Sequence, residues 1–318
     1  MNIVILDAMT LGDDIDLSIF ESIGNLTVYQ NTSLDELDER VKEAHVLIVN
    51  KVAMNENTLS NATNLKMIAL TATGYNNVDL EYAKKRGIRV CNVSGYSTQS
   101  VIQHTFALMF YVFEKLNYYD NYVKSGEYTK SPMFTHFGRT FNELYDKTWG
   151  IIGLGEIGRG VANVAKAFGA NVIYYSTSGK NNDSEYKRVS LEELLEMSDI
   201  VSIHAPLNEA TYHLMNYEAF KQMKKNAVLI NVGRGPIIDE KDLLRALKEE
   251  LIAAAALDVL EVEPMLSDSV LLEIKDSDRL VITPHIAWAT VEARTRLVAE
   301  VKDNIIAFMK GEERNVVV

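Results

Sequence analysis

Short apolar runs alternate with longer segments of mixed polarity along most of the chain, a pattern that predicts strands and helices in alternation. In the first part of the sequence, the expected strands are residues 3–6, 26–29, 46–49, 67–70 and 88–91. The expected helices are residues 17–23, 34–44, 57–62 and 80–86. Such alternation favours a parallel sheet with helices on both faces and with ligands bound beyond the carboxyl ends of the strands.

A glycine-rich turn with the sequence GLGEIG, residues 153–158, follows an apolar run at 149–154 and opens a segment with helical spacing of apolar residues. A second apolar run follows at 171–175, so the stretch predicts strand, tight turn, helix and strand. In such a unit Gly153 permits the turn, Gly155 lets the backbone approach a pyrophosphate, and Gly158 lets the helix pack closely on the sheet. The positive end of the helix faces the phosphates, so we expect dinucleotide binding here.

The alternation resumes after this unit. Further strands are expected at 200–203, 227–232, 252–257 and 280–282, and helices at 191–197, 217–222 and 240–247. With the two strands around the glycine turn, this makes six strands, which matches two mononucleotide-binding halves.

Two long segments with apolar stripes flank this second region. Residues 97–124 predict one long helix with a wide apolar surface, and residues 118–142 include an aromatic, irregular stretch that we interpret as a connecting or partner-contact segment. Residues 291–310 predict a helix that returns the chain to the first domain. We therefore expect an α/β fold of two doubly wound parallel-sheet domains. A discontinuous, flavodoxin-like domain comprises residues 1–97 and 290–318, and a Rossmann dinucleotide-binding domain comprises residues 98–289.

Composition narrows the classes of partner. At 318 residues the chain exceeds what one core usually supports. The net charge of −12 argues against nucleic acid or an anionic membrane, because both attract positive surfaces. The single cysteine, Cys91, excludes an internal disulfide and a multi-cysteine metal site, and no metal site is expected. A strand pattern starts at once without a basic leader, and no run spans a membrane, so we expect a cytoplasmic protein.

Candidate chemistry lies at the ends of three strands in the second half. Arg234 follows one strand, Glu263 comes shortly after the next, and His285 follows the last. Each type is common in bland surface roles, but the carboxyl ends of parallel strands meet at one edge, beside the crevice where a nicotinamide would lie. We therefore treat the three together as catalytic candidates.

Several long motifs occur in one order: ATGYNNVDL at 72–80, GYSTQSVIQHTFAL at 95–108, GIIGLGEIG at 150–158, INVGRGPIIDE at 230–240, ALDVLEVEP at 256–264 and TPHIAWAT at 283–290. With them the chain resembles the D-isomer-specific 2-hydroxyacid dehydrogenases over nearly its whole length. Within that family it is most similar to the glycerate dehydrogenase, or hydroxypyruvate reductase, branch.

The resemblance implies a role for each candidate. Arg234 would hold the substrate's carboxylate and 2-oxo oxygen, since a guanidinium donates two parallel hydrogen bonds. His285 would give a proton to that oxygen as hydride reaches C2. Glu263 would fix the imidazole's tautomer and favour its protonated form.

The resemblance also implies the surrounding contacts. Asp258 would accept a hydrogen bond from the nicotinamide carboxamide, and Trp288 would close the pocket. Residues at the substrate carboxylate would be Lys51, Gly74 and Tyr75 in the first domain, which acts as the substrate domain. Those at the cofactor would be Gly155, Glu156 and Ile157 at the pyrophosphate, His204, Ala205, Pro206 and Thr211 at the adenosine half, and Val232 and Gly233 near the nicotinamide.

One departure affects the cofactor. Enzymes of this fold that use NAD commonly carry an acidic residue about 20 positions past the glycines, where it binds the ribose hydroxyls. This chain has Ser176, Thr177, Ser178, Gly179 and Lys180 there. No carboxylate would repel a 2′-phosphate, and three hydroxyls with Lys180 would bind one, although the loop holds no arginine. We therefore favour NADP(H), with NAD(H) open.

The leading hypothesis is reduction of hydroxypyruvate or glyoxylate to the D-2-hydroxy acid. Alternatives are a dehydrogenase for a larger 2-oxo acid, formate or phosphite oxidation on the same scaffold, and a dinucleotide-sensing corepressor that binds peptide partners. The chain lacks the added tails that would favour the corepressor. The resemblance and the long helix at 97–124 predict a homodimer.

Overall fold

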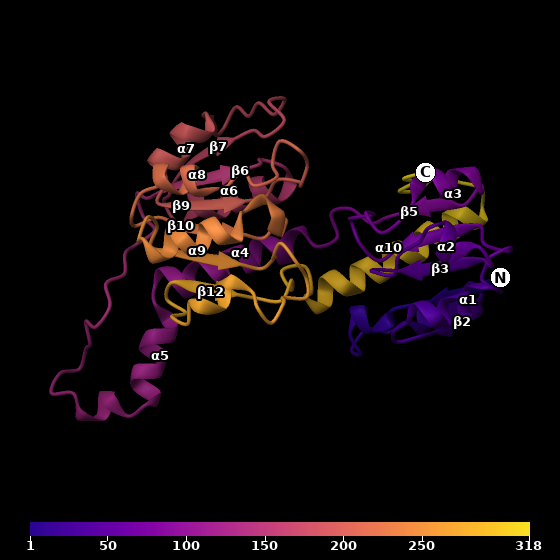
Figure 1. Cartoon of the computed structure of the whole chain (residues 1–318), viewed down its shortest axis with the longest axis horizontal. Coiled ribbons are helices and arrows are strands. Elements are labelled where there is room, and N and C mark those ends of the chain that lie inside the picture. Colours follow the sequence, from indigo (N-terminus) through magenta and orange to yellow (C-terminus); the bar gives the residue numbers. More distant parts are fainter. The chain divides into compact units, whose positions relative to one another are not determined.

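The computed structural model describes residues 1–318 and separates them into two compact units (Figure 1). One unit comprises Met1–Ser97 with Ala289–Val318, and the other comprises Thr98–Trp288. Each unit contains one parallel sheet, which confirms the predicted fold class. None of the helices is both long and apolar enough to cross a membrane.

The discontinuous unit has a five-stranded sheet in the order β2-β1-β3-β4-β5, the flavodoxin-like order. Its strands are β1 Asn2–Ile5, β2 Asn25–Val28, β3 Val46–Val49, β4 Met67–Leu70 and β5 Arg89–Cys91. Its helices are α1 Leu34–Val41, α2 Glu56–Leu59, α3 Leu80–Lys85 and α10 Val291–Met309, with 3-10 turns η1 Ala8–Leu11 and η2 Ser18–Ser22. The segment expected as a helix at 17–23 is therefore a short 3-10 turn. Every residue of β3 and β4 is buried, as expected for a sheet covered on both faces.

The C-terminal helix α10 belongs to this unit because its apolar stripe and one arginine attach it there. Leu297, Val301 and Ile305 are fully buried. Arg294 donates from Nη1 to the carbonyl of Leu11 at 2.7 Å and forms a two-point ion pair with Asp14. The chain therefore returns to its first unit at the end, as the sequence predicts.

The second unit has a seven-stranded parallel sheet in the order β12-β11-β10-β9-β6-β7-β8. The strands are β6 Thr148–Ile152, β7 Asn171–Tyr175, β8 Lys187–Arg188, β9 Ile200–Ile203, β10 Val228–Asn231, β11 Ala254–Leu257 and β12 Leu280–Ile282. The helices are α4 Thr98–Phe113, α5 Leu116–Lys124, α6 Glu156–Ala167, α7 Leu191–Met197, α8 Tyr217–Gln222 and α9 Glu240–Lys248, with 3-10 turns η3 Glu127–Lys130, η4 Gly235–Ile237 and η5 Val270–Glu273. The prediction of six strands missed β8, which has two charged residues and therefore no apolar pattern.

The single helix predicted over 97–124 is wrong, because the structure has two helices there. Lys115 adopts a left-handed conformation with φ 59° between α4 and α5. Ten of the sixteen residues of α4 are buried, whereas α5 buries none. The buried stripe ends at Phe113, and the Lys115 ammonium donates to the carbonyl of Asp278 at 3.1 Å, which fixes the break.

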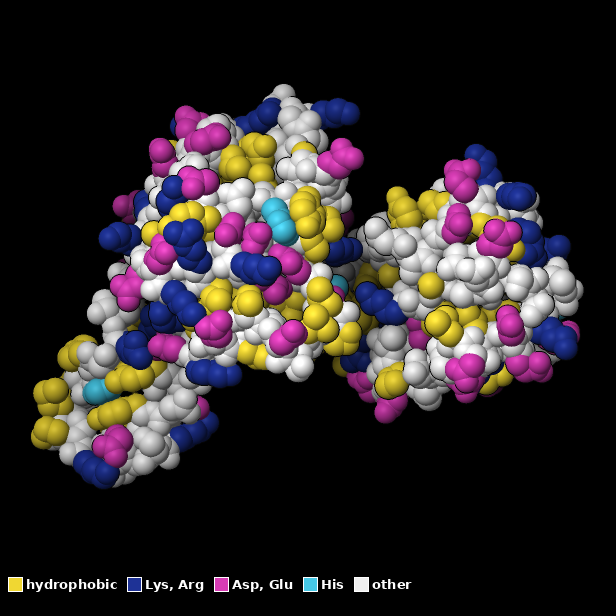
Figure 2. Space-filling view, viewed as in Figure 1, with side chains coloured by type: hydrophobic (Ala, Val, Ile, Leu, Met, Phe, Trp, Pro, Cys, Tyr) yellow, Lys and Arg dark blue, Asp and Glu magenta, His cyan; other side chains and the backbone are white.

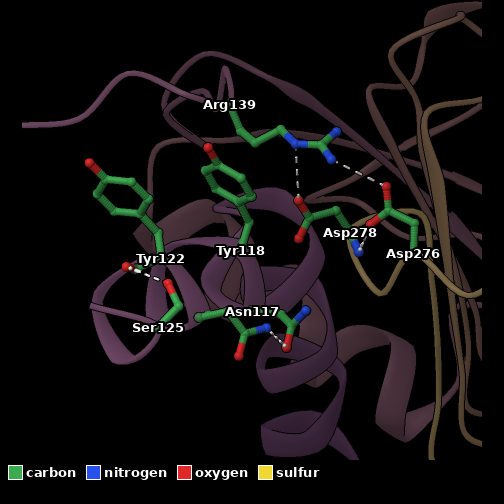
Figure 3. A pocket seen from close by; sticks show the side chains of 8 residues that line it. Asn117, Tyr118, Tyr122, Ser125, Arg139, Asp276 and Asp278 are labelled. Atoms are coloured by element: carbon green, nitrogen blue, oxygen red, sulfur yellow. Dashed lines mark hydrogen bonds and ion pairs between the residues drawn. The ribbon is translucent and has the colours of Figure 1, made fainter. Parts of the chain in front are cut away.

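Residues 116–142, which we call the arm, continue from this break. Arg139 of the arm lies beside Asp276 and Asp278, with Nη2 3.5 Å from the Asp276 carboxylate (Figure 3). A cavity of about 290 Å³ is lined there by arm residues and by both aspartates. The arm is thus attached to the loop before β12 by ionic contacts rather than by a buried core.

Candidate active site

The glycine turn between β6 and α6 has the geometry of a phosphate cradle. Gly153 has φ +93°, and a Cβ there would lie 2.9 Å from the backbone of Ala205. A Cβ at Gly158 would overlap the carbonyl oxygen of Gly153, whereas a Cβ at Gly155 would meet open space. The first and third glycines are therefore required by packing, and the second leaves the helix N-terminus accessible, which fits a pyrophosphate.

Glu156 is the first residue of α6, and its carboxylate is turned toward the start of α4. Its Oε1 accepts a hydrogen bond from Thr98 Oγ1 at 3.0 Å. The negative side chain at the predicted pyrophosphate position therefore has a protein partner.

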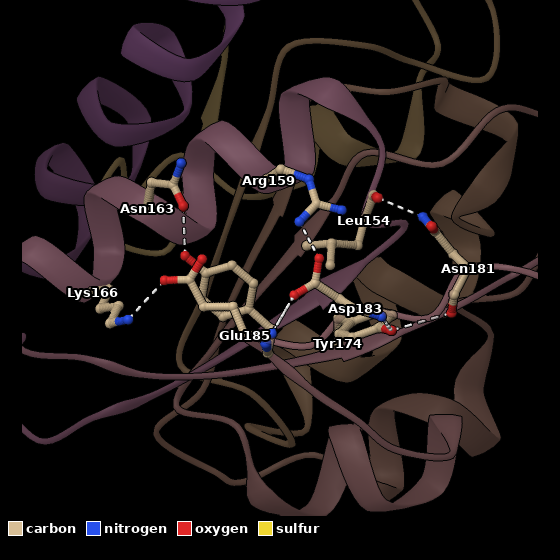
Figure 4. A network of polar contacts seen from close by, with 9 residues as sticks. Leu154, Arg159, Asn163, Lys166, Tyr174, Asn181, Asp183 and Glu185 are labelled. Carbon is tan, nitrogen blue, oxygen red and sulfur yellow. Dashed lines mark hydrogen bonds and ion pairs between the residues drawn. The ribbon is translucent and has the colours of Figure 1, made fainter.

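The loop after β7 is internally braced (Figure 4). Asn181 donates from its backbone to Ser176 Oγ at 3.3 Å and from its side chain to the carbonyl of Leu154. Asp183 forms an ion pair with Arg159 of α6, and this guanidinium is the main cause that lowers the pKa of Asp183. The carboxylate of Asp183 in this loop is therefore already paired with a positive charge.

One cation at this loop was not predicted from the sequence. Arg188, on β8, donates from Nη1 to the carbonyl of Gly179 and to Asn182 Oδ1, both at 3.0 Å. Strand β8 pairs with β7, with Arg188 opposite Tyr174, so the arginine returns to the loop from beyond its end. The only available signal was an arginine eight residues past Lys180, on a strand too short to recognise.

Arg234 stands on a fixed loop after β10. Asn231, fully buried, accepts a hydrogen bond from the amide of Gly233 and donates to the carbonyl of Arg234, both at 3.0 Å. A Cβ at Gly235 would overlap the carbonyl of Leu260, so the loop packs directly on the next one. The Arg234 side chain itself is exposed, which leaves a positioned guanidinium available to an anion.

His285 and Glu263 form a direct pair. His285 Nδ1 lies 2.7 Å from Glu263 Oε2, and Glu263 Oε1 accepts the amide of Leu260 at 3.0 Å. Because an ionised carboxylate only accepts, this contact assigns the proton to Nδ1 and directs Nε2 away from Glu263. His285 also has φ 54°, a conformation uncommon outside glycine.

Asp258 is occupied in a way that the sequence did not indicate. Its side chain is 1% exposed, and its oxygens accept hydrogen bonds from Thr283 Oγ1 at 2.6 Å and from the amides of Ile286 and Ala287 at 2.9 and 2.8 Å. Burial alone would raise the pKa of this carboxyl, but hydrogen bonds from His104, Thr283 and the two amides outweigh it and lower the pKa. The oxygens expected to meet a carboxamide are thus used to hold the loop of His285.

The residues expected at the adenosine half differ in their hydrogen-bond partners. Thr211 is fully buried, and its hydroxyl donates to the carbonyl of Pro206 at 2.7 Å, so it braces the loop. His204 Nε2 lies 3.0 Å from Ser202 Oγ, whereas its Nδ1 is buried without a partner. Burial lowers the pKa of His204 to about 3, so the ring is neutral near pH 7. An orphaned ring nitrogen beside the glycine cradle fits a site that a bound cofactor completes.

The candidates in the discontinuous unit share one edge of its sheet. Lys51 follows β3, and Gly74 and Tyr75 follow β4, which pairs with β3 in register. The amide of Lys51 donates to Asp7 Oδ2 at 2.7 Å. The side chains of Lys51 and Tyr75 are exposed. Trp288 is the last residue of the other unit, and it is half-buried.

A glycine cradle for a dinucleotide, an exposed arginine and a carboxylate-bound histidine on one sheet define a nicotinamide-dependent oxidoreductase of the doubly wound α/β class. The family model described as "D-isomer specific 2-hydroxyacid dehydrogenase, NAD binding domain" matches residues 106–287. The chain belongs to the D-isomer-specific 2-hydroxyacid dehydrogenase family, as its motifs indicated.

Relatives and solved structures agree with this assignment. The chain is 36% identical to the hydroxypyruvate reductase of Blautia hydrogenotrophica, with 100% of this chain and 99% of the relative covered. It is similar to the D-lactate dehydrogenase of Aquifex aeolicus complexed with NAD and lactic acid, at 29% identity and a TM-score of 0.85 over 100% of this chain and 99% of that one. It is also similar to an acyclic imino acid reductase in complex with NADPH and D-Arg, at 30% identity and a TM-score of 0.87 with both chains fully covered.

Proposed function

We propose that this protein transfers a hydride between a nicotinamide cofactor and C2 of a small 2-oxo acid, reducing hydroxypyruvate to D-glycerate or glyoxylate to glycolate. The observation that carries the proposal is the 2.7 Å pair of His285 and Glu263 on the sheet that also presents Arg234 and the glycine cradle. The named activity of the Blautia relative supports the same substrate class.

Each of the three side chains performs one task in the proposed reaction. Arg234 binds the carboxylate and the 2-oxo oxygen and holds the acid in one orientation. His285 donates its Nε2 proton to the oxygen that becomes the hydroxyl, and accepts it in the reverse direction. Glu263 keeps the other ring nitrogen protonated and stabilises the positive charge before transfer. A bound nicotinamide supplies the hydride.

The discontinuous unit is proposed as the substrate domain. Lys51, Gly74 and Tyr75 lie on adjacent loops at one sheet edge, and the exposed lysine suits a carboxylate. The proposed domain limits are residues 1–97 with 290–318 for this domain and 98–289 for the dinucleotide-binding domain.

NADP(H) is the proposed cofactor. The loop after β7 presents Thr177, Ser178 and Lys180, whereas Ser176 is buried and accepts the amide of Asn181. Arg188 adds a guanidinium tied to the same loop. The nearest acid, Asp183, is paired with Arg159, so it exerts little repulsion on a 2′-phosphate.

A homodimer is proposed from the arm. Phe134 and Phe137 are 91% and 83% exposed, and Met133 and Phe141 of the arm are also exposed. Hydrophobic side chains gather on the arm at the lower left of Figure 2. Such a patch on one segment is typical of an interface. A second copy is the occupant we expect, and a solution mass of twice 35.7 kDa would support it, whereas a mass of 35.7 kDa would exclude it.

The deciding experiment is steady-state reduction of hydroxypyruvate, glyoxylate and one bulkier 2-oxo acid with NADPH and NADH in parallel. Turnover of the small acids with NADPH supports both the substrate and the cofactor proposals. Preference for the bulkier acid indicates the alternative dehydrogenase, and preference for NADH rejects the role of the Arg188 loop. Cofactor binding without turnover of any acid favours a dinucleotide-sensing protein.

A further inference from the structure

The loop that carries His285 is held from one side by a chain of side chains. Thr283 Oγ1 donates to Asp258 Oδ1 at 2.6 Å, because the ionised carboxylate only accepts. The Thr283 hydroxyl has no other proton, so its 3.1 Å contact with His104 Nε2 assigns a proton to that nitrogen. The chain therefore runs from His104 through Thr283 to Asp258, and His104 Nε2 also lies 3.5 Å from Asp258 Oδ1.

Asp258 in turn accepts hydrogen bonds from the backbone of His285 and of the two residues after it. Its carboxylate receives the amides of Ile286 and Ala287, and its own carbonyl receives the amide of His285 at 2.8 Å. From α4, Ser100 Oγ donates to the carbonyl of Ala287 at 2.6 Å. The three backbone amides from His285 to Ala287 and the carbonyl of Ala287 are thereby assigned a partner.

This arrangement offsets an intrinsic preference of the backbone. A histidine at φ 54° is held in a sparsely populated region, at a cost on the order of 1 kcal/mol. Without the restraints, the residue would relax toward negative φ, and its ring would leave the position 2.7 Å from Glu263. A displacement of about 1 Å in a catalytic group can cost on the order of 100-fold in rate.

We propose that His104 and Thr283 are positioning residues for proton transfer, acting through Asp258 to keep His285 in its left-handed conformation against Glu263. This inference rests on the proposed function for its kinetic readout, but its structural readout is independent of any substrate. Neither residue needs to touch the substrate or cofactor for the role to hold.

Matched variants test each link. Thr283→Val keeps the shape of the side chain and removes the hydroxyl, whereas Thr283→Ser keeps the hydroxyl. His104→Leu removes the donor, and His104→Gln restores one near the position of Nε2. Since the His104 side chain is 20% exposed and on a helix surface, its variants are expected to fold even if Thr283→Val does not.

The kinetic measurement compares kcat, KM and cofactor affinity in all four variants. We expect Thr283→Val to lower kcat by about 10-fold to 100-fold while cofactor affinity changes less than about 3-fold. His104→Leu should act in the same direction more weakly, and both conservative variants should restore most of the rate. Wild-type kcat in both Thr283→Val and His104→Leu would overturn the proposal, as would an equal loss in the matched conservative variants.

Hydrogen exchange of the segment containing Ile286 and Ala287 is the readout that needs no activity. Their amides donate to a buried carboxylate, so they should exchange faster in Thr283→Val and at the wild-type rate in Thr283→Ser. Unchanged exchange in Thr283→Val would overturn the positioning role. If the wild-type protein reduces no 2-oxo acid yet the exchange pattern holds, the proposed function fails while the restraint on His285 stands.

Discussion

Two buried aspartates, one in each unit, hold strand-end loops that present candidate site residues. Asp7 accepts the amides of Asn50 and Lys51 at 3.0 and 2.7 Å and lies 3.3 Å from the amide of Val52. Asp258 accepts two amides of the His285 loop and adds a side-chain donor, Thr283. The two carboxylates are 5% and 1% exposed, so in both units a buried charge is compensated chiefly by loop backbone.

The difference lies in what each loop must maintain. Lys51 extends from its loop as an exposed, flexible side chain, and a held backbone is sufficient to present its charge. His285 must keep a ring nitrogen 2.7 Å from Glu263 in a left-handed backbone conformation. The loop proposed to serve proton transfer therefore carries more restraints than the loop proposed to bind the substrate's charge.

The largest expected effect comes from removing the two presented side chains. His285→Ala should lower kcat by about 10²- to 10⁴-fold, because a positioned acid is lost. Lys51→Ala should instead raise KM for the acid by about 10-fold, because it removes a binding charge rather than a proton donor. Steady-state kinetics on both variants measures this split.

Cofactor titration controls for misfolding in this pair. His285→Ala should bind NADPH as the wild type does, since His285 contacts Glu263 and not the glycine cradle. An equal loss of cofactor affinity would identify His285 as a structural residue, and a kcat effect of the same size in Lys51→Ala would remove the distinction between the loops.

The second comparison replaces the two buried aspartates, one in each unit. Asp258→Asn should lower kcat by about 10- to 100-fold, because an amide cannot accept at both positions and His285 is released. Asp7→Asn should raise KM with a smaller change in kcat. Each is expected to destabilise the fold by about 1–3 kcal/mol, since buried amides lose a charged acceptor. Urea unfolding measures that part, and the split between kcat and KM tests the comparison. Equal kinetic changes in the two variants would contradict it.

The anchors also show what the sequence predicts and what it does not. Apolar periodicity located eleven of the twelve strands, and the glycine spacing located the cradle, because both depend on neighbouring residues. The partners of Asp258 are Thr283, Ile286 and Ala287, 25 to 29 positions later in the chain, and His104 on helix α4. A strand-end acid has the same local pattern whether it binds a ligand or a loop, so its role could not be read without the fold.

The helix break at Lys115 and the position of Arg188 were not predicted from the sequence, for related reasons. No glycine or proline marks Lys115, and the partner of its ammonium, the carbonyl of Asp278, lies more than 160 positions later. Arg188 reaches its loop because a two-residue strand pairs with β7. In both cases a long-range contact decided the local structure.

A third strand end, the loop after β7, has its own aspartate, Asp183, which accepts the amides of Glu185 and Tyr186 at 2.7 and 3.0 Å. The loop is also tied by Asn181 and Arg188. Arg188→Ala should reduce affinity for NADPH by about 10-fold and leave NADH little changed, because only the former loses a charge partner. Lys180→Ala is the matched variant and should show a similar preference shift. Equal loss for both cofactors would mean that Arg188 only supports the loop, which titration of each cofactor measures directly.

The smallest expected effect concerns His204, whose buried ring nitrogen Nδ1 has no hydrogen-bond partner. Burial lowers its folded pKa to about 3, whereas an unfolded histidine titrates near 6.5. Between these values the unfolded chain binds more protons, so the free energy of unfolding falls as the pH drops through this window.

His204→Gln should flatten that fall by at most about 1.4 kcal/mol per pH unit, because glutamine does not titrate. The measurement is urea unfolding of both proteins at several pH values between 4 and 7. Carboxylates and the other histidines contribute equally to both curves, so the difference between the curves isolates His204. Parallel curves would mean that folding does not shift the pKa of His204, and a wild-type curve that falls less than that of His204→Gln would mean that the imidazole is protonated in the folded state. The orphaned Nδ1 would then be a charged donor rather than a neutral group awaiting the cofactor.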